Sequence, residues 1–486
     1  MRIGELLVAA RLVTPDDVDA ALQLQSSEGG SIGQKLIEIG AIDQATLDKF
    51  SHQIPKAPVS IAETGISETE LLNLLLKTVL SGGLETLAAC ADAMRLPTAI
   101  MAELFDSGVR NQLFNGLGQA MGGGGMRYGL TEKGRKRAVE ALEASSYAGA
   151  APVTLASYTH WLELQKVTNE NIDWAGIQAA FADLQVADAF VDQIGPAIRS
   201  GRPVLLYCPP GNGKTSTAQR LSRVFKDVIY VPHAVMIDGQ IMRVFDPDVH
   251  QPVDNKPKSA LLTVSLFAED FDQRWVACKR PFIVTGGELT LEMLDLRYEP
   301  TANFYEAPLH VKAAGGCLLI DDFGRQIVSP TALLNRWIVP LESRVDYMKL
   351  HTGKSFKLPF EAIVIFSTNL APADLMDPAF LRRIPYKLEV GAPPLALYKR
   401  IWADVSAANG LGAAFNDAVF DDIVAKLTAR NVPLAAYQPR FLIEQIVAAC
   451  RFKAMPMGFH VEFVDYALSN LSIGGDAPPG TLAKVA

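Results

Sequence analysis

Lys214 and Thr215 directly follow a loop rich in glycine and proline, an arrangement suited to holding phosphate groups. Val204–Tyr207 is a short apolar run that predicts a strand buried on both faces of a parallel sheet. Pro209–Gly213 must leave that strand as a loop, and apolar residues at helical spacing predict a helix from Thr215 onward. The first amides of that helix, its dipole and the Lys214 ammonium would face one anion, while the Thr215 hydroxyl would ligate Mg²⁺.

The phosphate-binding pattern G-x-x-x-x-G-K-[ST] is met at Gly213, Lys214 and Thr215, but Cys208 stands at the position of the first glycine. We expect Cys208 to be tolerated, because the amides that face phosphate come mainly from the second half of the loop and Cys208 needs only an ordinary negative φ. The predicted nucleotide-binding residues of this stretch are Pro210, Gly211, Asn212, Gly213, Lys214, Thr215 and Ser216.

Two carboxylates follow a second apolar run, Cys317–Ile320, which predicts another buried strand. Ligands bind at the carboxyl ends of strands in open α/β sheets, so we expect Asp321 and Asp322 beside the phosphate loop. Asp321 would hold Mg²⁺ through water, and Asp322 would orient or deprotonate the attacking water. A third strand, Ala362–Phe366, leads to Asn369, whose amide could hydrogen-bond the γ-phosphate or that water.

Three arginines complete the predicted site. Arg382 and Arg383 follow a short helix far from the phosphate loop in sequence, which suits a finger offered to the γ-phosphate of a neighbouring subunit. A solvated basic pair is the alternative. Arg440, in the helix that opens at Gln438, could reach back to the phosphates of its own subunit.

Length and composition indicate a soluble protein of about three domains. The chain has 486 residues, about half of them apolar, and a net charge of −8, so a field that attracts nucleic acid or an acidic membrane is not expected. It has no apolar run of about 18 residues, so we expect no membrane span. The five scattered cysteines predict reduced, mostly buried thiols and a cytoplasmic location, and the seven histidines have no metal-ligand spacing.

Residues 1–52 contain an internal repeat. Ile3-Gly4, Leu7-Val8 and Val13 align at one offset with Ile32-Gly33, Leu36-Ile37 and Ile42, and Thr14 and Asp43 are predicted to cap the helices that follow. The stretch resembles the N-terminal domain of type II secretion and type IV pilus assembly ATPases. In some members this pattern binds cyclic di-GMP, which would involve Arg2, Gly4 and Gly33 here, although Ser31 stands where the second copy would carry arginine. A structural or partner-docking domain is the favoured alternative to a nucleotide sensor.

Residues 66–147 predict three helices, a glycine-tipped hairpin and a further helix, the order of a winged helix. Glu70–Leu80, Leu84–Met94 and Pro97–Leu117 are the expected helices. Five basic residues gather at the wing: Arg127, Lys133, Arg135, Lys136 and Arg137. We favour a protein-contacting unit over a DNA-binding one, because the presumed recognition helix offers few phosphate contacts after its first turn.

Together, these motifs resemble an AAA+ ATPase. The order of phosphate loop, paired aspartates, Ser-Thr-Asn, paired arginines and Pro-Arg helix is that of this family, and phrases such as Ile237–Pro247 and Leu334–Tyr347 are similar to a MoxR-like group of ATPases with chaperone-like activity. The expected fold is therefore an α/β P-loop NTPase domain (157–391) with a C-terminal helical lid (392–473) and a tail (474–486), preceded by the small helical N-terminal domain and the winged-helix-like domain. The resemblance implies ATP and Mg²⁺ as ligands and a homo-oligomer, a hexameric ring. The family usually carries Glu at the place of Asp322.

The resemblance implies that a client would be gripped by an aromatic or apolar loop at the central pore of the ring. Phe304 and Tyr305, in a stretch that reads as a loop before Cys317, are the candidates for a pore loop that grips a protein partner, with core packing as the alternative. The first hypothesis is a ring that couples ATP hydrolysis to remodelling of a protein. The others are an ATP- and cyclic-di-GMP-responsive regulator of pilus or secretion machinery and a DNA-binding winged-helix regulator.

Overall fold

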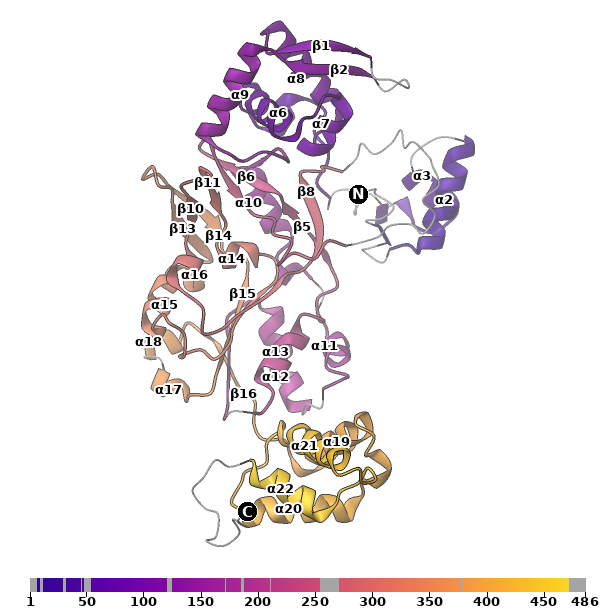
Figure 1. Cartoon of the computed structure of the whole chain (residues 1–486), viewed down its shortest axis with the longest axis vertical. Helices are drawn as coiled ribbons and strands as arrows, with labels where there is room; N and C mark the ends of the chain where they lie inside the picture. Colours follow the sequence, from indigo (N-terminus) through magenta and orange to yellow (C-terminus); the bar gives the residue numbers. More distant parts are fainter. Residues whose placement is uncertain are drawn as a thin grey trace.

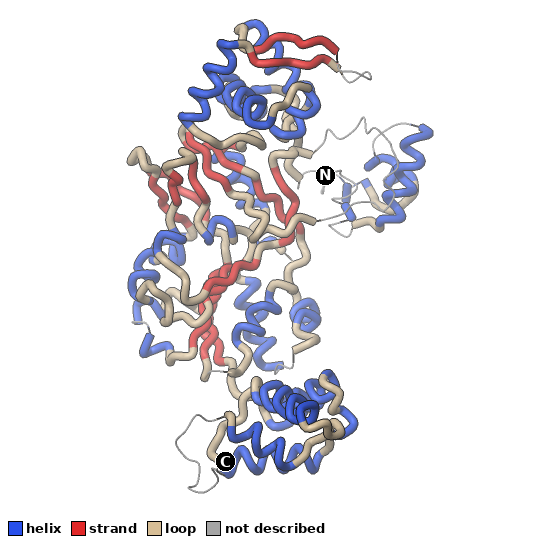
Figure 2. Tube along the Cα trace, in the orientation of Figure 1, coloured by secondary structure: helices blue, strands red, loops and turns tan. Residues whose placement is uncertain are grey.

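The computed structural model describes residues 7–8, 12–28, 32–44, 46–47, 54–119, 125–170, 172–184, 188–209, 211–253, 271–375 and 378–471. The molecule is elongated, with a helix–hairpin unit at one end, a C-terminal helical unit at the other and the sheets between them (Figure 1). Strands gather in the middle of the molecule, and the C-terminal end is entirely helical in the part that is described (Figure 2). Among the described helices, none is long and apolar enough to cross a membrane.

The central sheet has five parallel strands in the order β16-β4-β15-β12-β9. Their bounds are Tyr386–Glu389 (β16), Val204–Tyr207 (β4), Ile363–Thr368 (β15), Cys317–Ile320 (β12) and Phe282–Thr285 (β9). The predictions of a strand at Val204–Tyr207 and of another at Cys317–Ile320 are confirmed. Since the strands are parallel, the residues that follow β4, β12 and β15 meet at one edge of the sheet.

Helices cover both faces of this sheet, and alternate strand residues point to them. Leu206 and Leu319 pack on one side against α11 (Trp174–Ala180), α12 (Asp188–Arg199) and α13 (Lys214–Leu221). Leu205 and Leu318 pack on the other side against α15 (Pro330–Arg336) and α16 (Ile338–Ser343). Burial on both faces explains why these strands are continuous apolar runs.

The segment between α13 and β12 is long enough for an insertion, and it supplies most strands of two additional sheets; β3, from before α13, completes one of them. One sheet has the order β10-β11-β7-β6-β3, and β5 pairs with β8. The bounds are Arg297–Glu299 (β10), Phe304–Glu306 (β11), Gln240–Arg243 (β7), Ala234–Ile237 (β6), Val153–Thr154 (β3), Val228–Pro232 (β5) and Trp275–Lys279 (β8). A further hairpin, β13 (Val345–Lys349) with β14 (Ser355–Pro359), lies before β15.

Phe304 and Tyr305, the candidates for a pore loop, lie on strand β11 of the inserted sheet and not in a loop. Tyr305 is only 2% exposed, and its hydroxyl hydrogen-bonds the ring and accepts the backbone N–H of His351, at the tip of the β13–β14 hairpin. Phe304 packs edge-on against Tyr147 of the preceding segment. The burial of Tyr305 favours core packing over a role in gripping a client, whereas Phe304 is half-buried.

The helix–hairpin unit contains the expected elements in the expected order, from Glu68 to Ala144. They are α6 (Glu68–Gly82), α7 (Leu87–Met94), α8 (Thr98–Arg110), β1 (Phe114–Gln119), β2 (Met126–Leu130) and α9 (Glu132–Ala144). The third helix ends at Arg110 and not at Leu117, because Phe114–Gln119 pairs with β2 instead. The core of the unit is continuous with Ala234 and Ile241 of the inserted sheet, so the unit is fixed to that sheet.

The N-terminal repeat forms helices α2 (Pro15–Glu28) and α3 (Ile32–Glu38). Both predicted caps are confirmed: the Asp17 N–H donates to Thr14 Oγ1, and the Thr46 N–H donates to Asp43 Oδ1 at 2.6 Å. The segment between residues 52 and 66 contains α5 (Ile61–Thr64), and residue 157, the expected start of the α/β domain, falls within α10 (Leu155–Leu164).

The C-terminal unit consists of four helices around one apolar core. They are α19 (Leu395–Ala408), α20 (Asp417–Ala429), α21 (Gln438–Phe452) and α22 (Val461–Ser469). Buried aromatic rings, Tyr398 and Trp402 of α19 and Phe420 of α20, hold the helices together. The remaining short helices are η1 (Val167–Asn169), η2 (Leu291–Leu294), α14 (Leu309–Lys312), α17 (Pro372–Leu375), α18 (Pro378–Leu381) and η3 (Gly412–Ala414).

Candidate nucleotide-binding site

A cavity of about 1010 Å³ lies between the carboxyl edge of the central sheet and the C-terminal helical unit. Most of the predicted site residues line it: Gly211, Asn212, Gly213, Lys214, Thr215, Ser216, Asp321, Asp322, Asn369 and Arg440. Pro210 lies outside the described residues. Residues separated by more than two hundred positions in sequence therefore meet around one space, at the edge where the parallel strands predicted that they would.

Two glycines shape the phosphate loop. Gly211 has φ of +88° and Gly213 has φ of +82°, the left-handed region that glycine adopts without strain. Gly213 precedes the first residue of α13, Lys214, so the loop turns directly into the helix. The N–H groups of a helix's first turn have no partner within the helix, and they point out of its N-terminus.

The Lys214 ammonium is surrounded by oxygen acceptors. Its side chain is buried, and Nζ donates to the carbonyl oxygens of Cys208 at 3.0 Å and Pro209 at 3.4 Å. It also hydrogen-bonds the side-chain oxygen of Asn369. Anionic oxygens form stronger hydrogen bonds with an ammonium than neutral carbonyls do, so a phosphate could replace these partners.

Thr215 and Asp321 form the second part of the site. The Thr215 hydroxyl donates to Oδ2 of Asp321 at 2.7 Å, and Oδ1 of Asp321 accepts the N–H of Asp322 at 3.0 Å. Mg²⁺ prefers a few oxygen ligands of this kind and retains several waters. The hydroxyl and the carboxylate are thus placed as the phosphate-loop and strand contributions to a magnesium site.

Asp322 is held in an uncommon backbone conformation, with φ of +47°. The neighbouring strand holds it there, because the N–H of Phe323 donates to Ser367 O at 2.6 Å and the Thr368 hydroxyl donates to Phe323 O at 2.8 Å. Asn369 Nδ2 donates to Oδ1 of Asp322 at 3.0 Å. Since its side-chain oxygen accepts a hydrogen bond from Lys214, Asn369 connects Lys214 to the carboxylate of Asp322.

This donor set fits a nucleoside triphosphate with Mg²⁺. The Lys214 ammonium and the helix N-terminus would meet phosphate oxygens, the Thr215–Asp321 pair would meet the metal, and the Asp322 carboxylate would meet an attacking water. The fit follows from the chemistry of these groups and from their placement on one cavity.

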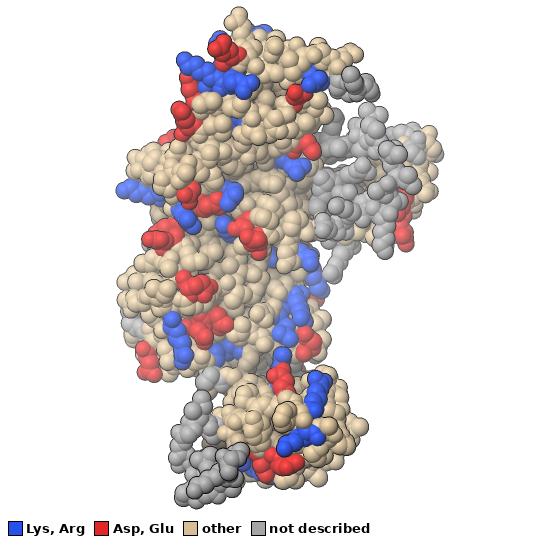
Figure 3. All heavy atoms as spheres, in the orientation of Figure 1, with Lys and Arg blue, Asp and Glu red and all other residues tan. Residues whose placement is uncertain are grey.

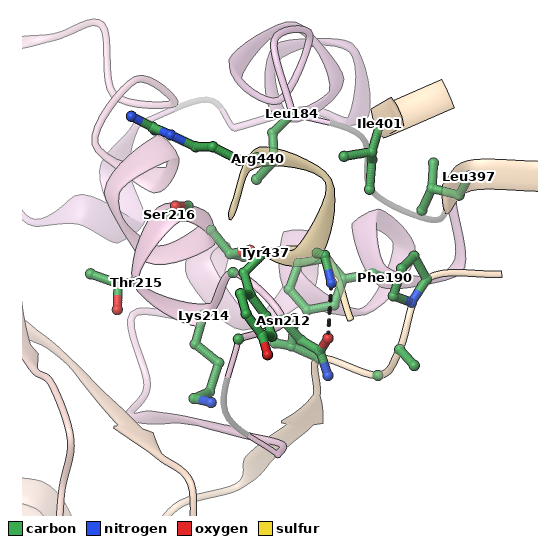
Figure 4. Close-up of a pocket in the computed structure, with 18 of the residues that line it drawn as sticks. Leu184, Phe190, Asn212, Lys214, Thr215, Ser216, Leu397, Ile401, Tyr437 and Arg440 are labelled. Carbon is green, nitrogen blue, oxygen red and sulfur yellow. Dashed lines mark hydrogen bonds between the residues drawn. The ribbon is translucent and has the colours of Figure 1, made fainter. Parts of the chain in front are cut away.

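Sequence reasoning missed the apolar part of the cavity. Leu184 and Phe190 line it from the segment before β4, and Leu397 and Ile401 line it from α19 (Figure 4). These side chains could cover a nucleobase. Their sequence context is that of ordinary helix residues, so only the packing of α19 against the sheet domain reveals them. Nearby, the hydrogen bond from Arg223 lowers the pKa of Asp183, another lining residue.

The arginines are placed differently from one another. Arg440 lines the cavity but is paired with Glu444 of its own helix at 2.8 Å, which raises its pKa. Arg382 and Arg383 follow α18, as predicted, and neither of them lines the cavity of its own chain. Arg382 is exposed, whereas Arg383 lies over Phe380 and contacts Glu342 at 3.3 Å. A role at a phosphate would therefore require a second copy of the chain.

The basic residues of the helix–hairpin unit are partly engaged within it. Arg127 Nε donates to Glu85 at 2.7 Å, Arg137 Nε donates to Asn73 at 2.9 Å, and Lys133 Nζ donates to Asn111 O at 3.0 Å. On the face drawn in Figure 3, acidic side chains are interspersed with the basic ones of this unit. Such a surface offers few side chains for phosphate contacts.

Of the residues predicted to bind cyclic di-GMP, Arg2 and Gly4 lie outside the described residues. A side chain at Gly33 would approach Leu47 Cδ2 to 2.8 Å. Close helix packing is thus a sufficient reason for glycine at this position.

Comparisons with known proteins add little to this geometry. Residues 395–470, most of the C-terminal helical unit, match a family described as a domain of unknown function, DUF8689. No curated protein matches the chain. Among solved structures, the chain is similar to a mutant RuvB of Thermotoga maritima, with 13% identity over 63% of this chain and 73% of that one and a TM-score of 0.31. It is also similar to NtrX of Brucella abortus, with 12% identity over 60% of this chain and 57% of that one and a TM-score of 0.38.

Proposed function

We propose that this chain binds ATP with Mg²⁺ and hydrolyses it, as an AAA+-type ATPase that remodels a protein partner. One observation carries the proposal: Lys214, which opens the helix after β4, is joined by hydrogen bonds at one cavity to Asn369 after β15 and, through it, to Asp322 after β12. An ammonium, a carboxylate and a bridging amide in this order match the needs of phosphoryl transfer to water.

Each residue has a distinct role in the proposed reaction. Lys214 and the loop amides bind and orient the β- and γ-phosphates, and Thr215 and Asp321 hold Mg²⁺, which supplies charge neutralisation when bound. Asp322 accepts the proton of the attacking water, and Asn369 keeps its carboxylate oriented toward that water. The backbone at Asp322 is fixed by β15, so the carboxylate is positioned before substrate arrives.

We further propose that the active form is a homo-oligomeric ring, a hexamer by resemblance, in which Arg382 or Arg383 acts on the neighbouring subunit. Their position outside their own cavity supports a contribution in trans. An arginine supplied from a neighbour stabilises transition-state charge and makes hydrolysis depend on assembly.

The helix–hairpin unit is assigned to protein contact in this proposal, in the manner of a winged helix, and the N-terminal unit to recruitment. The internal engagement of Arg127, Lys133 and Arg137 favours a protein partner over DNA. The MoxR-like resemblance suggests chaperone-like remodelling as the outcome of turnover.

Turnover measured against protein concentration tests the proposal. We expect Mg²⁺-dependent release of phosphate from ATP, with activity per chain rising as oligomers form and lost in Lys214→Ala. A purified, folded chain that binds no ATP would refute nucleotide binding, and full activity in a monomer would refute the shared site.

A further inference from the structure

The C-terminal helical unit is attached directly to the phosphate loop. Just before helix α21, the N–H of Tyr437 donates to Gly211 O at 3.0 Å, and the N–H of Ala436 donates to Oδ1 of Asn212 at 3.3 Å, the dashed line in Figure 4. Asn212 is only 9% exposed. The two hydrogen bonds therefore join a buried part of the loop to the start of the helix that carries Arg440.

The ring of Tyr437 occupies the space beside Gly211. A side-chain carbon at Gly211 would lie 2.2 Å from Cδ1 and 2.7 Å from Cε1 of Tyr437. Gly211 is thus required both for its left-handed conformation and because the ring lies against its backbone. Tyr437 also lines the cavity, with the ring of Phe441 at 6.1 Å in an edge-on arrangement.

We infer that Tyr437 is a positioning residue, which sets the phosphate loop and the C-terminal helical unit in the register that nucleotide binding requires. This inference rests on the proposed function and names a residue of the same site. Arg440 follows Tyr437 by three residues, so the contact with Gly211 fixes where Arg440 enters the cavity. The same contact supports the backbone of Gly211, next to the amides proposed to bind phosphate.

A positioning role differs from direct stacking on the nucleobase in one measurable way. Stacking would matter only for ligands that contain a base, whereas support of the loop matters equally for a ligand that is only phosphate. Inorganic tripolyphosphate with Mg²⁺ is therefore the discriminating probe. The ring, and not the hydroxyl, makes the contact with Gly211, so Tyr437→Phe is the conservative variant that retains it.

Calorimetric titration of the full chain with Mg²⁺-ATP and with Mg²⁺-tripolyphosphate provides the test. We expect Tyr437→Ala to weaken both ligands by a similar factor, roughly tenfold, which corresponds to about 1.4 kcal/mol. Tyr437→Phe should restore both affinities, and Tyr466→Ala, which removes an exposed tyrosine of α22, should change neither. Loss of ATP affinity with unchanged tripolyphosphate affinity, or no loss for either, would overturn the inference.

A double-substitution cycle tests the contact itself. Gly211→Ala should weaken ligand binding in the wild-type background. In the Gly211→Ala background, Tyr437→Ala should reduce the affinity by a smaller factor than it does in the wild type, because it removes the ring that clashes with the new side chain. Independent, multiplicative effects would contradict the contact. The same four proteins can be compared by their thermal unfolding midpoints, a measurement that needs no nucleotide. If the wild-type chain does not bind ATP, the proposed function is refuted, but the unfolding midpoints still decide whether Tyr437 contacts Gly211. If Gly211→Ala does not fold, the comparison of Tyr437→Ala with Tyr437→Phe decides.

Discussion

Oγ1 of Thr215 lies 2.7 Å from Oδ2 of Asp321, although the two residues are 106 positions apart in sequence. Thr215 lies in the first turn of helix α13 and Asp321 directly follows strand β12, so the pair exists only because both elements meet at one sheet edge. This relationship supports the predicted magnesium site more directly than either motif does alone.

Removal of the Thr215 hydroxyl should weaken the use of Mg²⁺ more than the binding of nucleotide. We expect Thr215→Ala to raise the Mg²⁺ concentration for half-maximal hydrolysis by roughly tenfold or more, equivalent to about 1.4 kcal/mol, because one oxygen ligand is lost. Thr215→Ser should retain most of the activity. Binding of ATP measured in EDTA should change little. Thr428→Ala, which removes an exposed hydroxyl in α20, is the control and should leave the Mg²⁺ dependence unchanged. An unchanged Mg²⁺ dependence in Thr215→Ala would exclude Thr215 as a ligand.

Asp322 should be needed for hydrolysis and not for binding. Asp322→Asn keeps the size of the side chain, and asparagine tolerates the left-handed conformation found here, so the loop should stay intact. Loss of the proton acceptor should lower kcat by roughly 10²- to 10⁴-fold with the ATP dissociation constant changed less than about threefold. A variant that retains a tenth of the wild-type kcat would contradict the assignment of Asp322 as the base.

An arginine acting in trans should be revealed by mixing inactive variants. Arg382→Ala and Arg383→Ala should each bind ATP, and the one that removes the finger should lose about 10³-fold or more in kcat. Lys214→Ala subunits cannot bind phosphate but carry intact arginines, so mixed rings should regain part of the activity. Mixtures no more active than the sum of their components would show that the site is complete within one chain.

The central sheet and the gathering of Gly213, Asp321 and Asn369 at its edge were predictable because their signals are local. Strands buried on both faces are continuous apolar runs, and the loop at Gly211 and Gly213 has only one chemically sensible form. The strand at Phe304 and Tyr305 was not predicted because both residues stand in a segment rich in turn residues, while the strand depends on pairing with β7 and the burial of Tyr305 depends on His351, which are distant in sequence. The contact of Tyr437 with Gly211 was not predictable either, because it depends on how two units dock.

A buried ion pair away from the site should be needed for folding. Arg280 Nε donates to Glu170 at 2.7 Å, and its NH1 donates to the carbonyl oxygens of Gln165 and Gly315. Both charged side chains are at least nine-tenths buried. Arg280→Leu would leave the Glu170 carboxylate buried without its partner, so we expect a loss of about 3–5 kcal/mol in the free energy of unfolding.

Urea unfolding at neutral pH checks this prediction against a matched variant. Arg297 is 73% exposed and lies 3.6 Å from Glu299, so Arg297→Leu should change the free energy of unfolding by no more than about 0.5 kcal/mol. Equal effects of the two substitutions would show that the buried pair contributes no more than a surface pair.

The stability of the chain should fall as the pH decreases from about 6.5 to about 4, in part because of His233. Burial, together with the nearby positive charge of Arg95, lowers the pKa of His233 to about 4. Between these values the unfolded chain binds a proton that the folded chain does not, so acidification favours unfolding, and the stability is fully present only above pH 6.5. The contribution is at most about 3 kcal/mol, and partial exposure of the ring reduces it.

Burial also lowers the pKa values of His250 and His310, so the measurement is the difference between wild type and His233→Gln in denaturant midpoint at each pH. The stability of wild type relative to His233→Gln should fall as the pH decreases over this range, and a constant difference would exclude His233 as a source of the acid sensitivity.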